Sequence, residues 1–492
     1  MEKRVSGVLL SVTSLPSRHG IGDFGKEAYN FVDRLSKTGF SLWQILPLNP
    51  IGYGHSPYQP YSSFALDEQF ISLDSLTEAG LLSKTPSFLK NETKVHYEDV
   101  REFKLKYLYK AYEKDMKLHP NGLKSFILKN PWVKSWGVFS MFHRRYKCSW
   151  NEWPDEAKNF FKDNSKLSKE DKKQADFEIW LQKIAFGQWD KLHKYANKKG
   201  ISIIGDIPFY VGYDSCDVWT NLDCFLINEV TLEPDFIAGV PPDYFSATGQ
   251  RWGNPIYDWD YLEKTDFAFL QSRILINSST YDILRLDHFR AFDTYWKIPS
   301  SCPTAVEGAW IEAPGYKFFD SLFAKKDGLQ EKIIAEDLGD LRPEVLTLRD
   351  HYNFPGMNVI EFTFNDFELQ HKGNWDETNA VCYLGTHDNQ TFSSFFANLS
   401  DYEKGEWNNV LASKGIEEDT INKKMEAYCL QKKGKWAILS MQDILDYDDS
   451  TRTNVPSTVN DINWTFKLSS FKEFDKALPW LKKDLSISGR KA

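Results

Sequence analysis

The stretch ILRLDHFRAFDTYW, residues 283–296, begins like a buried β-strand and becomes charged within a few residues. Four ionisable side chains, those of Arg285, Asp287, His288 and Arg290, fall within six residues directly after an apolar run. Apolar strands that end in polar groups are typical of parallel sheets that carry a site at their carboxyl edge. The stretch therefore predicts a strand and a cluster of reactive side chains at its end.

Similar apolar runs with polar carboxyl ends recur along the chain, and with this one they number eight. They span residues 6–12, 41–48, 201–209, 283–288, 332–339, 357–362, 380–389 and 436–445. Helix-like segments lie between many of them; residues 25–39, for example, carry an apolar face at helical spacing and end at Gly39. Eight buried strands that alternate with helices predict an α/β protein with a (β/α)8 TIM barrel.

The spacing of these strands is uneven, which predicts large helical and loop insertions. About 150 residues separate the second and third strands, so residues 53–199 are expected to form an insertion rich in helices and aromatic side chains. Smaller insertions are expected over 210–280, after the third strand, and over 390–435, after the seventh. No Ser/Gly linker, low-complexity tract or repeat interrupts the chain, so residues 1–492 are expected to form a single elaborated barrel.

Composition excludes several classes of partner and cofactor. The formal net charge of −9 argues against nucleic acid, and the absence of an apolar run of about 18 residues argues against a transmembrane helix. The start MEKRVSGVLLSVTSLP has its apolar run broken by Ser and Thr, which indicates a first strand and a cytoplasmic protein, although a trimmed organellar form would look similar. No Walker A loop, GxGxxG motif or zinc-like cysteine spacing is present, so no metal or nucleotide cofactor is expected.

Aromatic residues make up 15% of the chain, with 17 Trp and 23 Tyr. A Phe-rich core explains most of the Phe residues. It explains less well the Tyr and Trp that stand beside Gly, Pro and Asn in the loop-like stretches 53–64 and 248–261. Flat apolar rings with polar tips are suited to stacking on sugar rings.

Four carboxylates are predicted to meet at the carboxyl edge of the barrel, because each follows one of the predicted strands. They are Asp206, Asp287, Glu336 and Asp388, at the ends of the third, fourth, fifth and seventh strands. Taken singly, a carboxylate at a strand end is more simply a helix cap or half of an ion pair. Four of them on one rim, with His288 and His387 beside them, indicate a catalytic centre.

Retaining glycosyl transfer is the chemistry that needs such a set. It uses one carboxylate as nucleophile and a second as general acid and then base, about 5–5.5 Å apart. Arg285 lies two residues before Asp287, on the same side of the strand, and is expected to keep that carboxylate ionised. Glu336, surrounded by like charge, is expected to retain its proton.

Longer motifs connect these residues to a known family. The chain resembles the 4-α-glucanotransferases, the amylomaltases or disproportionating enzymes of the α-amylase-like superfamily, from SGVLLSVTSLPSRHGIGDFG through GDIPFYV, RLDHFRAFDTYWKIP, AEDLG and GTHDNQT to NWTFKL. The loops SPYQPYS and PPDYFSATGQRWGNP distinguish this family from ordinary α-amylases. The resemblance implies a barrel with insertions and no separate C-terminal β-sandwich.

The resemblance also implies roles for individual residues. Asp287 matches the nucleophile, Glu336 the acid/base and Asp388 a third carboxylate that binds sugar hydroxyls. A further set matches residues that contact substrate: Arg285, His387, Tyr58, Ser56, Asp206, Asp243, Phe245, Trp252 and His288. Among these, Asp243, Phe245 and Trp252 belong to a loop that covers the donor chain. Departures from the family are small: Ala291 stands where Gly is more frequent, and Gln390 where an acidic or small residue is common.

The expected activity is cleavage of an α-1,4-glucan or maltooligosaccharide and transfer of the released segment from Asp287 to the 4-hydroxyl of glucose, maltose or another glucan. No cofactor is needed, because protein groups can supply the charge stabilisation. An α-1,4-glucan hydrolase on the same scaffold remains the alternative, since both reactions share one intermediate. A glucan-binding protein without activity would require a broken carboxylate set, and none is broken.

Overall fold

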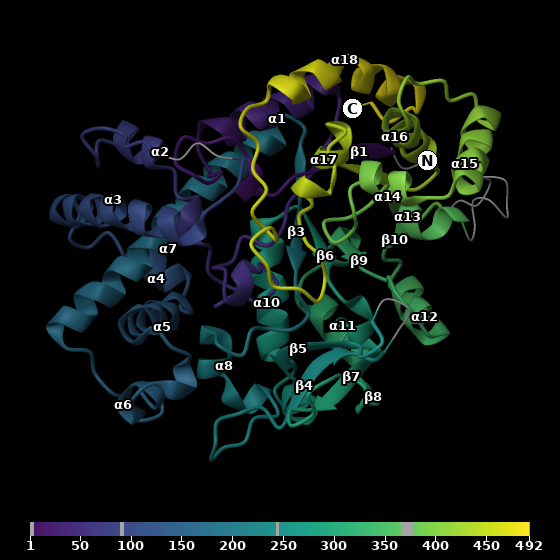
Figure 1. The fold of residues 1–492 in the computed structure, drawn as a ribbon. Helices are drawn as coiled ribbons and strands as arrows, with labels where there is room; N and C mark the ends of the chain where they lie inside the picture. The colour runs from purple at the N-terminus through teal and green to yellow at the C-terminus, as the bar shows by residue number, and fades with distance from the viewer. Residues whose placement is uncertain (1–3, 89–92, 243–245, 366–376, 492) are drawn as a thin grey trace.

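The computed structural model describes residues 4–88, 93–242, 246–365 and 377–491. Its central sheet has eight parallel strands in the order β10-β11-β12-β1-β2-β3-β6-β9. Their bounds are β1 (Val5–Leu9), β2 (Leu42–Gln44), β3 (Ser202–Ile207), β6 (Ile283–Leu286), β9 (Ile333–Ala335), β10 (Gly356–Val359), β11 (Ala380–Tyr383) and β12 (Trp436–Ser440). Each lies within or beside one of the eight predicted runs, so the predicted (β/α)8 barrel is confirmed (Figure 1).

The seam of the barrel lies between β9 and β10, the two ends of this strand order. The N–H of Ala335 donates to the carbonyl of Pro355 at 3.0 Å across the seam. The carboxylate of Asp337 accepts a hydrogen bond from the N–H of Met357 at 2.7 Å. These bonds bring the fifth and sixth strands together and nearly close the sheet.

Helices surround the barrel and fill the insertions. Between β2 and β3 lie α2 (Leu73–Glu78), α3 (Tyr97–Leu118), α4 (Lys124–Lys129), α5 (Val133–Tyr146), α6 (Asp155–Lys158) and α7 (Lys169–Lys198), drawn in blue on the left of Figure 1. The others are α1 (Lys26–Thr38), α8 (Cys216–Thr220), α9 (Trp259–Lys264), α10 (Ala268–Thr280), α11 (Gly315–Lys325), α12 (Pro343–His351), α13 (Ile360–Thr363), α14 (Phe392–Asn398), α15 (Asp401–Ser413), α16 (Ile421–Gln431), α17 (Met441–Ile444) and α18 (Lys472–Ile487). None of the helices in the described ranges is both long and apolar enough to cross a membrane.

A second, antiparallel sheet lies at one end of the barrel, at the bottom of Figure 1. Its order is β5-β4-β7-β8, with β4 (Phe236–Val240), β5 (Gln250–Pro255), β7 (Thr294–Pro299) and β8 (Ala309–Glu312). None of these four strands was predicted from the sequence. They are short, and β5 reads QRWGNP, so turn-forming residues hide the strand pattern. The sheet joins the segment after β3 to the segment after β6.

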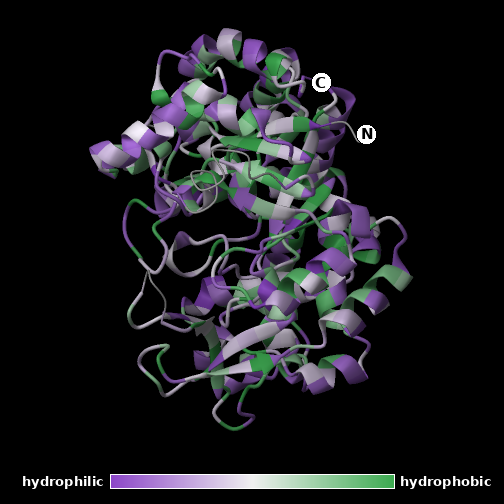
Figure 2. Ribbon diagram, turned by 90° about the vertical axis from the view of Figure 1, so that its right-hand side faces the viewer, coloured by the Kyte–Doolittle hydropathy of each residue, from purple (hydrophilic) through white to green (hydrophobic). Residues whose placement is uncertain are grey.

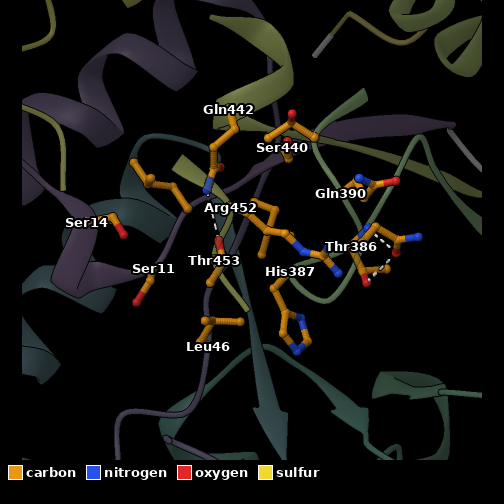
Figure 3. A pocket seen from close by; sticks show the side chains of 14 residues that line it. Ser11, Ser14, Leu46, Thr386, His387, Gln390, Ser440, Gln442, Arg452 and Thr453 are labelled. Carbon is orange, nitrogen blue, oxygen red and sulfur yellow. Dashed lines mark hydrogen bonds between the residues drawn. The ribbon is translucent and has the colours of Figure 1, made fainter. Parts of the chain in front are cut away.

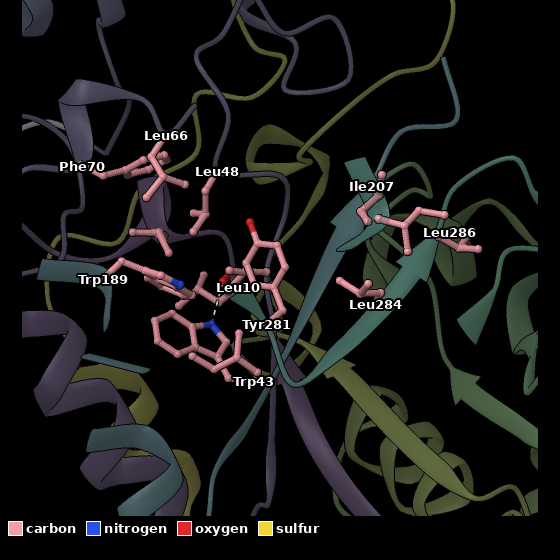
Figure 4. Close-up of a cluster of buried hydrophobic side chains, with 14 of the residues drawn as sticks. Leu10, Trp43, Leu48, Leu66, Phe70, Trp189, Ile207, Tyr281, Leu284 and Leu286 are labelled. Atoms are coloured by element: carbon pink, nitrogen blue, oxygen red, sulfur yellow. Dashed lines mark hydrogen bonds between the residues drawn. The ribbon is translucent and has the colours of Figure 1, made fainter. Parts of the chain in front are cut away.

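Strand residues alternate between the barrel interior and the surrounding helices. Ile204 and Ile334 belong to the apolar cluster inside the barrel, together with Leu9 and Val381. Leu284 and Leu286 point to the other side and join the large cluster between the sheet and the helices (Figure 4). Figure 2 shows many hydrophobic residues on the strands and hydrophilic residues on the outer turns of the helices. This alternation decides which strand-end side chains face the interior.

Candidate active site

Three of the four predicted carboxylates project from strand ends on the interior side of the barrel. Asp206 lies two residues after the interior Ile204, and Glu336 two residues after the interior Ile334, so both share that side. Asp287 directly follows β6 and Glu336 directly follows β9. Asp388 is different, since it lies in the loop after β11, which ends at Tyr383.

Arg285 connects the carboxylates at the bottom of the site. Its Nη1 lies 2.7 Å from Oδ2 of Asp206 and 3.0 Å from Oδ1 of Asp287. The hydroxyl of Tyr58 also donates to Oδ2 of Asp206, at 2.7 Å. Arg285 and Asp206 are buried, whereas the side chain of Asp287 keeps 27% of its surface exposed. Asp206 thus orients Arg285 and Tyr58, and Asp287 is left open to a ligand.

Glu336 is held by backbone groups on both of its oxygens. The N–H of His288 donates to Oε2 at 2.7 Å, and the N–H of Leu338 donates to Oε1 at 3.0 Å. The first bond accompanies a left-handed backbone at His288, with φ of 51°. This conformation is uncommon for a residue other than glycine and is often found at functional sites. It places Glu336 against the residue that follows Asp287.

The close approach of these carboxylates changes their protonation. Burial raises the pKa of Asp287 well above its ordinary value; Arg285 opposes this, and the nearby charges of Asp206, Glu336 and Asp388 add to it. Burial also raises the pKa of Glu336, against the effects of Arg285 and the two backbone hydrogen bonds. Arg285 is therefore beside Asp287 as expected, but its charge does not outweigh burial and three like charges. Asp287 and Glu336 together therefore retain a proton at a pH at which isolated carboxyl groups are ionised.

His387 and Asp388 form the opposite side of the site. Nε2 of His387 lies 3.4 Å from Oδ2 of Asp388, and Nδ2 of Asn454 donates to Oδ1 of Asp388 at 2.6 Å. The ring of His387 stacks on Tyr58 with centroids 5.1 Å apart and planes at 8°. Burial lowers the pKa of His387, so the neutral ring is favoured. Asp388 exposes 43% of its side chain.

Aromatic rings enclose His288 on the side of the antiparallel sheet. The ring of Trp252, in β5, meets His288 edge to face at 4.8 Å, and Tyr210 lies 6.3 Å away. Burial lowers the pKa of His288 to about 3, so the ring is neutral. Its Nε2 is buried and has no hydrogen-bond partner within the described ranges. A sugar hydroxyl is a suitable partner for this nitrogen.

The SPYQPYS loop is fixed to the rest of the site. Oγ of Ser56 accepts the N–H of Tyr58 at 3.2 Å, so Ser56 shapes its own loop in this structure. Nε2 of Gln59 donates to the carbonyl of Trp252 at 3.1 Å, which joins this loop to β5. The predicted contacts of Asp243 and Phe245 lie outside the described residues.

Sequence reasoning missed three residues that line this site: Tyr210, Asn454 and Trp464. The ring of Trp464 lies 5.7 Å from Tyr58 and 6.0 Å from His387. Tyr210 stands in the GDIPFYV motif, which could have drawn attention to it. Asn454 and Trp464 follow no strand and precede no helix directly, so their positions carried no signal. Within the described ranges, no three His, Cys, Asp or Glu residues are grouped so as to hold a metal ion.

Comparison with known proteins agrees with this geometry. The profile of the family Glyco_hydro_77, described as 4-alpha-glucanotransferase, matches residues 10–472. A 4-alpha-glucanotransferase of Aquifex aeolicus is 38% identical over 491 residues, covering 99% of each chain. A 4-alpha-glucanotransferase of Clostridium butyricum is 40% identical over 93% of this chain and 95% of its own.

A solved structure of the same kind matches the whole fold. The amylomaltase from Streptococcus agalactiae in complex with acarbose superimposes with a TM-score of 0.93 at 34% identity, covering 100% of both chains. Sequence and structure comparisons thus agree with each other and with the resemblance found in the motifs. The chain belongs to the 4-alpha-glucanotransferase family, the amylomaltases.

Proposed function

We propose that this 4-α-glucanotransferase works with retention, through a covalent glycosyl ester on Asp287, on α-1,4-glucans and maltooligosaccharides. The observation that carries the proposal is the contact of Arg285 with both Asp206 and Asp287, at 2.7 and 3.0 Å, beside a second carboxylate of raised pKa. One ionised and one protonated carboxyl group are what a retaining mechanism requires at its start.

The proton of the pair belongs on Glu336. Arg285 contacts Asp287 at 3.0 Å and opposes protonation there, and an ionised Asp287 would repel a second negative charge on Glu336. In the first step, Asp287 attacks the anomeric carbon while Glu336 gives its proton to the oxygen of the leaving sugar. In the second step, Glu336 takes the proton of the acceptor's 4-hydroxyl, and the oxygen displaces Asp287.

The neutral rings and Asp388 bind the sugar in this scheme. His387 and His288 have lowered pKa values, so each offers one N–H donor and one acceptor nitrogen to hydroxyl groups. Asp388 keeps nearly half of its side chain open and can accept hydroxyl hydrogens. Tyr58 presents an aromatic surface that is already fixed by Asp206 and His387. Glucose, maltose or a longer glucan is the proposed acceptor.

The competing reaction is hydrolysis of the same intermediate. Water is present at about 55 M, so transfer requires acceptor sugars to be held in place and water to be kept away. The aromatic lining from Tyr58, Tyr210 and Trp252 supports transfer over hydrolysis. A cytoplasmic location remains a prediction from the sequence.

Incubation with maltotriose alone tests the reaction. We expect a ladder of longer maltooligosaccharides together with glucose; glucose and maltose in equal amounts, without longer chains, would identify a hydrolase. A 2-deoxy-2-fluoro-α-maltosyl fluoride tests the ester. It should add one glycosyl mass to the peptide that contains Asp287, and labelling of another peptide, or of an Asp287→Asn variant, would reject the assigned nucleophile.

A further inference from the structure

The three carboxylates of the site are held by different means. The N–H of Asp287 donates to the carbonyl of Ile207 at 3.0 Å, and the N–H of Glu336 donates to Leu286 at 3.1 Å, so both continue the barrel's ladder of hydrogen bonds. The N–H of Asp388 instead reaches Oγ1 of Thr386, within its own loop, at 3.3 Å. The barrel therefore does not fix Asp388 directly, and another support must do so.

That support comes from a segment more than sixty residues further along the chain, residues 449–454, which we call the clamp. Figure 1 shows the yellow chain before α18 running across the barrel strands. Nη2 of Arg452 donates to the carbonyl of Asp388 at 2.6 Å, and its Nε donates to the carbonyl of Asn454 at 2.7 Å. Asn454 in turn contacts the Asp388 carboxylate and, through its N–H, the carbonyl of His387 at 3.1 Å.

Asp449 holds the other end of the same loop. Its Oδ1 accepts the N–H of Thr391 at 2.7 Å, and its Oδ2 accepts Nε2 of Gln390 at 2.8 Å. Nη1 of Arg452 lies 3.9 Å from the same Oδ2, so the clamp is one connected set of charges. Gln390, one of the departures from the family pattern, is a neutral donor to this carboxylate, whereas an acidic side chain there would repel it.

Burial and direction support a positioning role for Arg452. Its side chain is 15% exposed and, in Figure 3, lies above His387, between Thr453 and Thr386. It binds the backbone oxygen of Asp388 and leaves the carboxylate, 43% exposed, facing the open site. The guanidinium donates one hydrogen bond to the loop, at Asp388, and one to its own segment, at Asn454, so it ties the two segments together in a way that an ammonium group cannot.

We propose that Arg452 is a positioning residue of glucan transfer: together with Asp449 and Gln390 it fixes the loop 386–391 and thereby the Asp388 carboxylate. The proposal rests on the function proposed above, because it acts through Asp388. Misplacing a reacting group by about 1 Å from a distance can reduce turnover about 100-fold. Loss of the clamp should therefore reduce kcat while the fold remains.

A double-mutant cycle tests this route of action. Arg452→Ala is made in the unaltered chain and in an Asp388→Asn chain, and turnover of α-maltosyl fluoride with maltose as acceptor is measured in all four proteins. In the unaltered chain we expect Arg452→Ala to lower kcat about 10- to 100-fold and to change KM less than about 3-fold. In the Asp388→Asn chain we expect the same substitution to lower kcat less than about 2-fold. Arg34→Ala is the matched control, since it breaks an arginine–aspartate pair with Asp475 between α1 and α18 and should leave kcat unchanged.

Gln390→Glu provides a second variant in case Arg452→Ala does not fold. It places a like charge beside Asp449 and should lower kcat in the unaltered chain and not in the Asp388→Asn chain. Equal losses in both backgrounds, or no loss from either variant, would overturn the proposal. Two results would contradict the proposed function itself: full turnover by Asp388→Asn, or failure of the unaltered chain to make maltooligosaccharides longer than its substrate. Either result would also remove the basis for the positioning role.

Discussion

Replacement of Asp443 by Asn should stabilise the protein at neutral pH and leave its stability unchanged in acid. Asp443 is 2% exposed at the start of α17, and its Oδ1 accepts the N–H of Phe392 at 2.8 Å. The acidic groups that face it are Asp446, Asp449, Glu361 and Glu426. Burial is the main cause that raises the pKa of Asp443 from 3.8 to about 6.

The sign and size of the effect follow from this pKa. Between the two values the folded state binds more protons than the unfolded state, so the free energy of unfolding falls as pH rises through this interval. A pKa difference of about 2 corresponds to about 3 kcal/mol, and this full cost is present at neutral pH. Asn keeps an acceptor oxygen for Phe392 and carries no charge, so the cost disappears.

Thermal unfolding at about pH 4 and about pH 7.5 measures the effect. With an unfolding entropy of about 2.1 cal/mol/K per residue, 492 residues give about 1 kcal/mol/K, so 3 kcal/mol corresponds to about 3 °C in Tm. The increase should be seen at the higher pH and be absent at the lower one. Asp448→Asn is the control, because hydrogen bonds to Ser450 lower the pKa of that exposed group and the sign should reverse. A Tm increase that is the same at both pH values would refute the reasoning.

Substitutions at three further residues test other features of the structure. Asp287→Asn should reduce turnover by about 1,000-fold or more while the circular dichroism spectrum and maltooligosaccharide binding persist. Near-normal activity of the purified variant would reject its role as nucleophile. Tyr58→Phe should lower kcat/KM by the equivalent of about 1 kcal/mol, because the hydrogen bond from its hydroxyl to Asp206 is lost. Tyr58→Ala should lower it by about 1–2 kcal/mol more, because the ring is also lost. Equal losses in the two variants would mean that the ring contributes nothing. Ser457→Gly should raise Tm by about 1–2 °C. Ser457 is exposed and has a φ of 62°, a conformation that costs a residue other than glycine about 1–2 kcal/mol. An unchanged Tm would show that this strain is absent.

The barrel and two of its carboxylates were predictable because both depend on local patterns. An apolar run shows a buried strand, and a period of two tells which side each residue faces. Asp287 and Glu336 directly follow such runs, so their meeting at one edge follows from parallel strands alone. Gly39 likewise ends α1 with φ of 104°, as the predicted helix stop required.

Features that depend on distant segments were not predictable in this way. The antiparallel sheet pairs β4 with β7, and short strands such as QRWGNP carry no alternation to reveal such a pairing. The pKa of Asp287 was predicted from one neighbour, Arg285, whereas its direction is decided by burial and by carboxylates from three other strands or loops. Local sequence identifies the ionisable groups of a site better than it predicts their pKa shifts, which depend on burial and on charges from distant segments.

Trp464 illustrates why the part of the site that the C-terminal segment contributes could not be predicted from the sequence. Its backbone has φ of 67°, which costs a bulky residue about 1–2 kcal/mol, and a pattern such as INWTF would never predict it. Packing must offset this cost, and the ring is 8% exposed against Tyr58 and His387, from loops more than three hundred residues apart. A strained backbone that persists at such a junction indicates that the position of the ring is imposed by the site rather than by its own segment. Together with the clamp, it assigns to residues 449–464 the task of holding loops that the barrel strands do not reach.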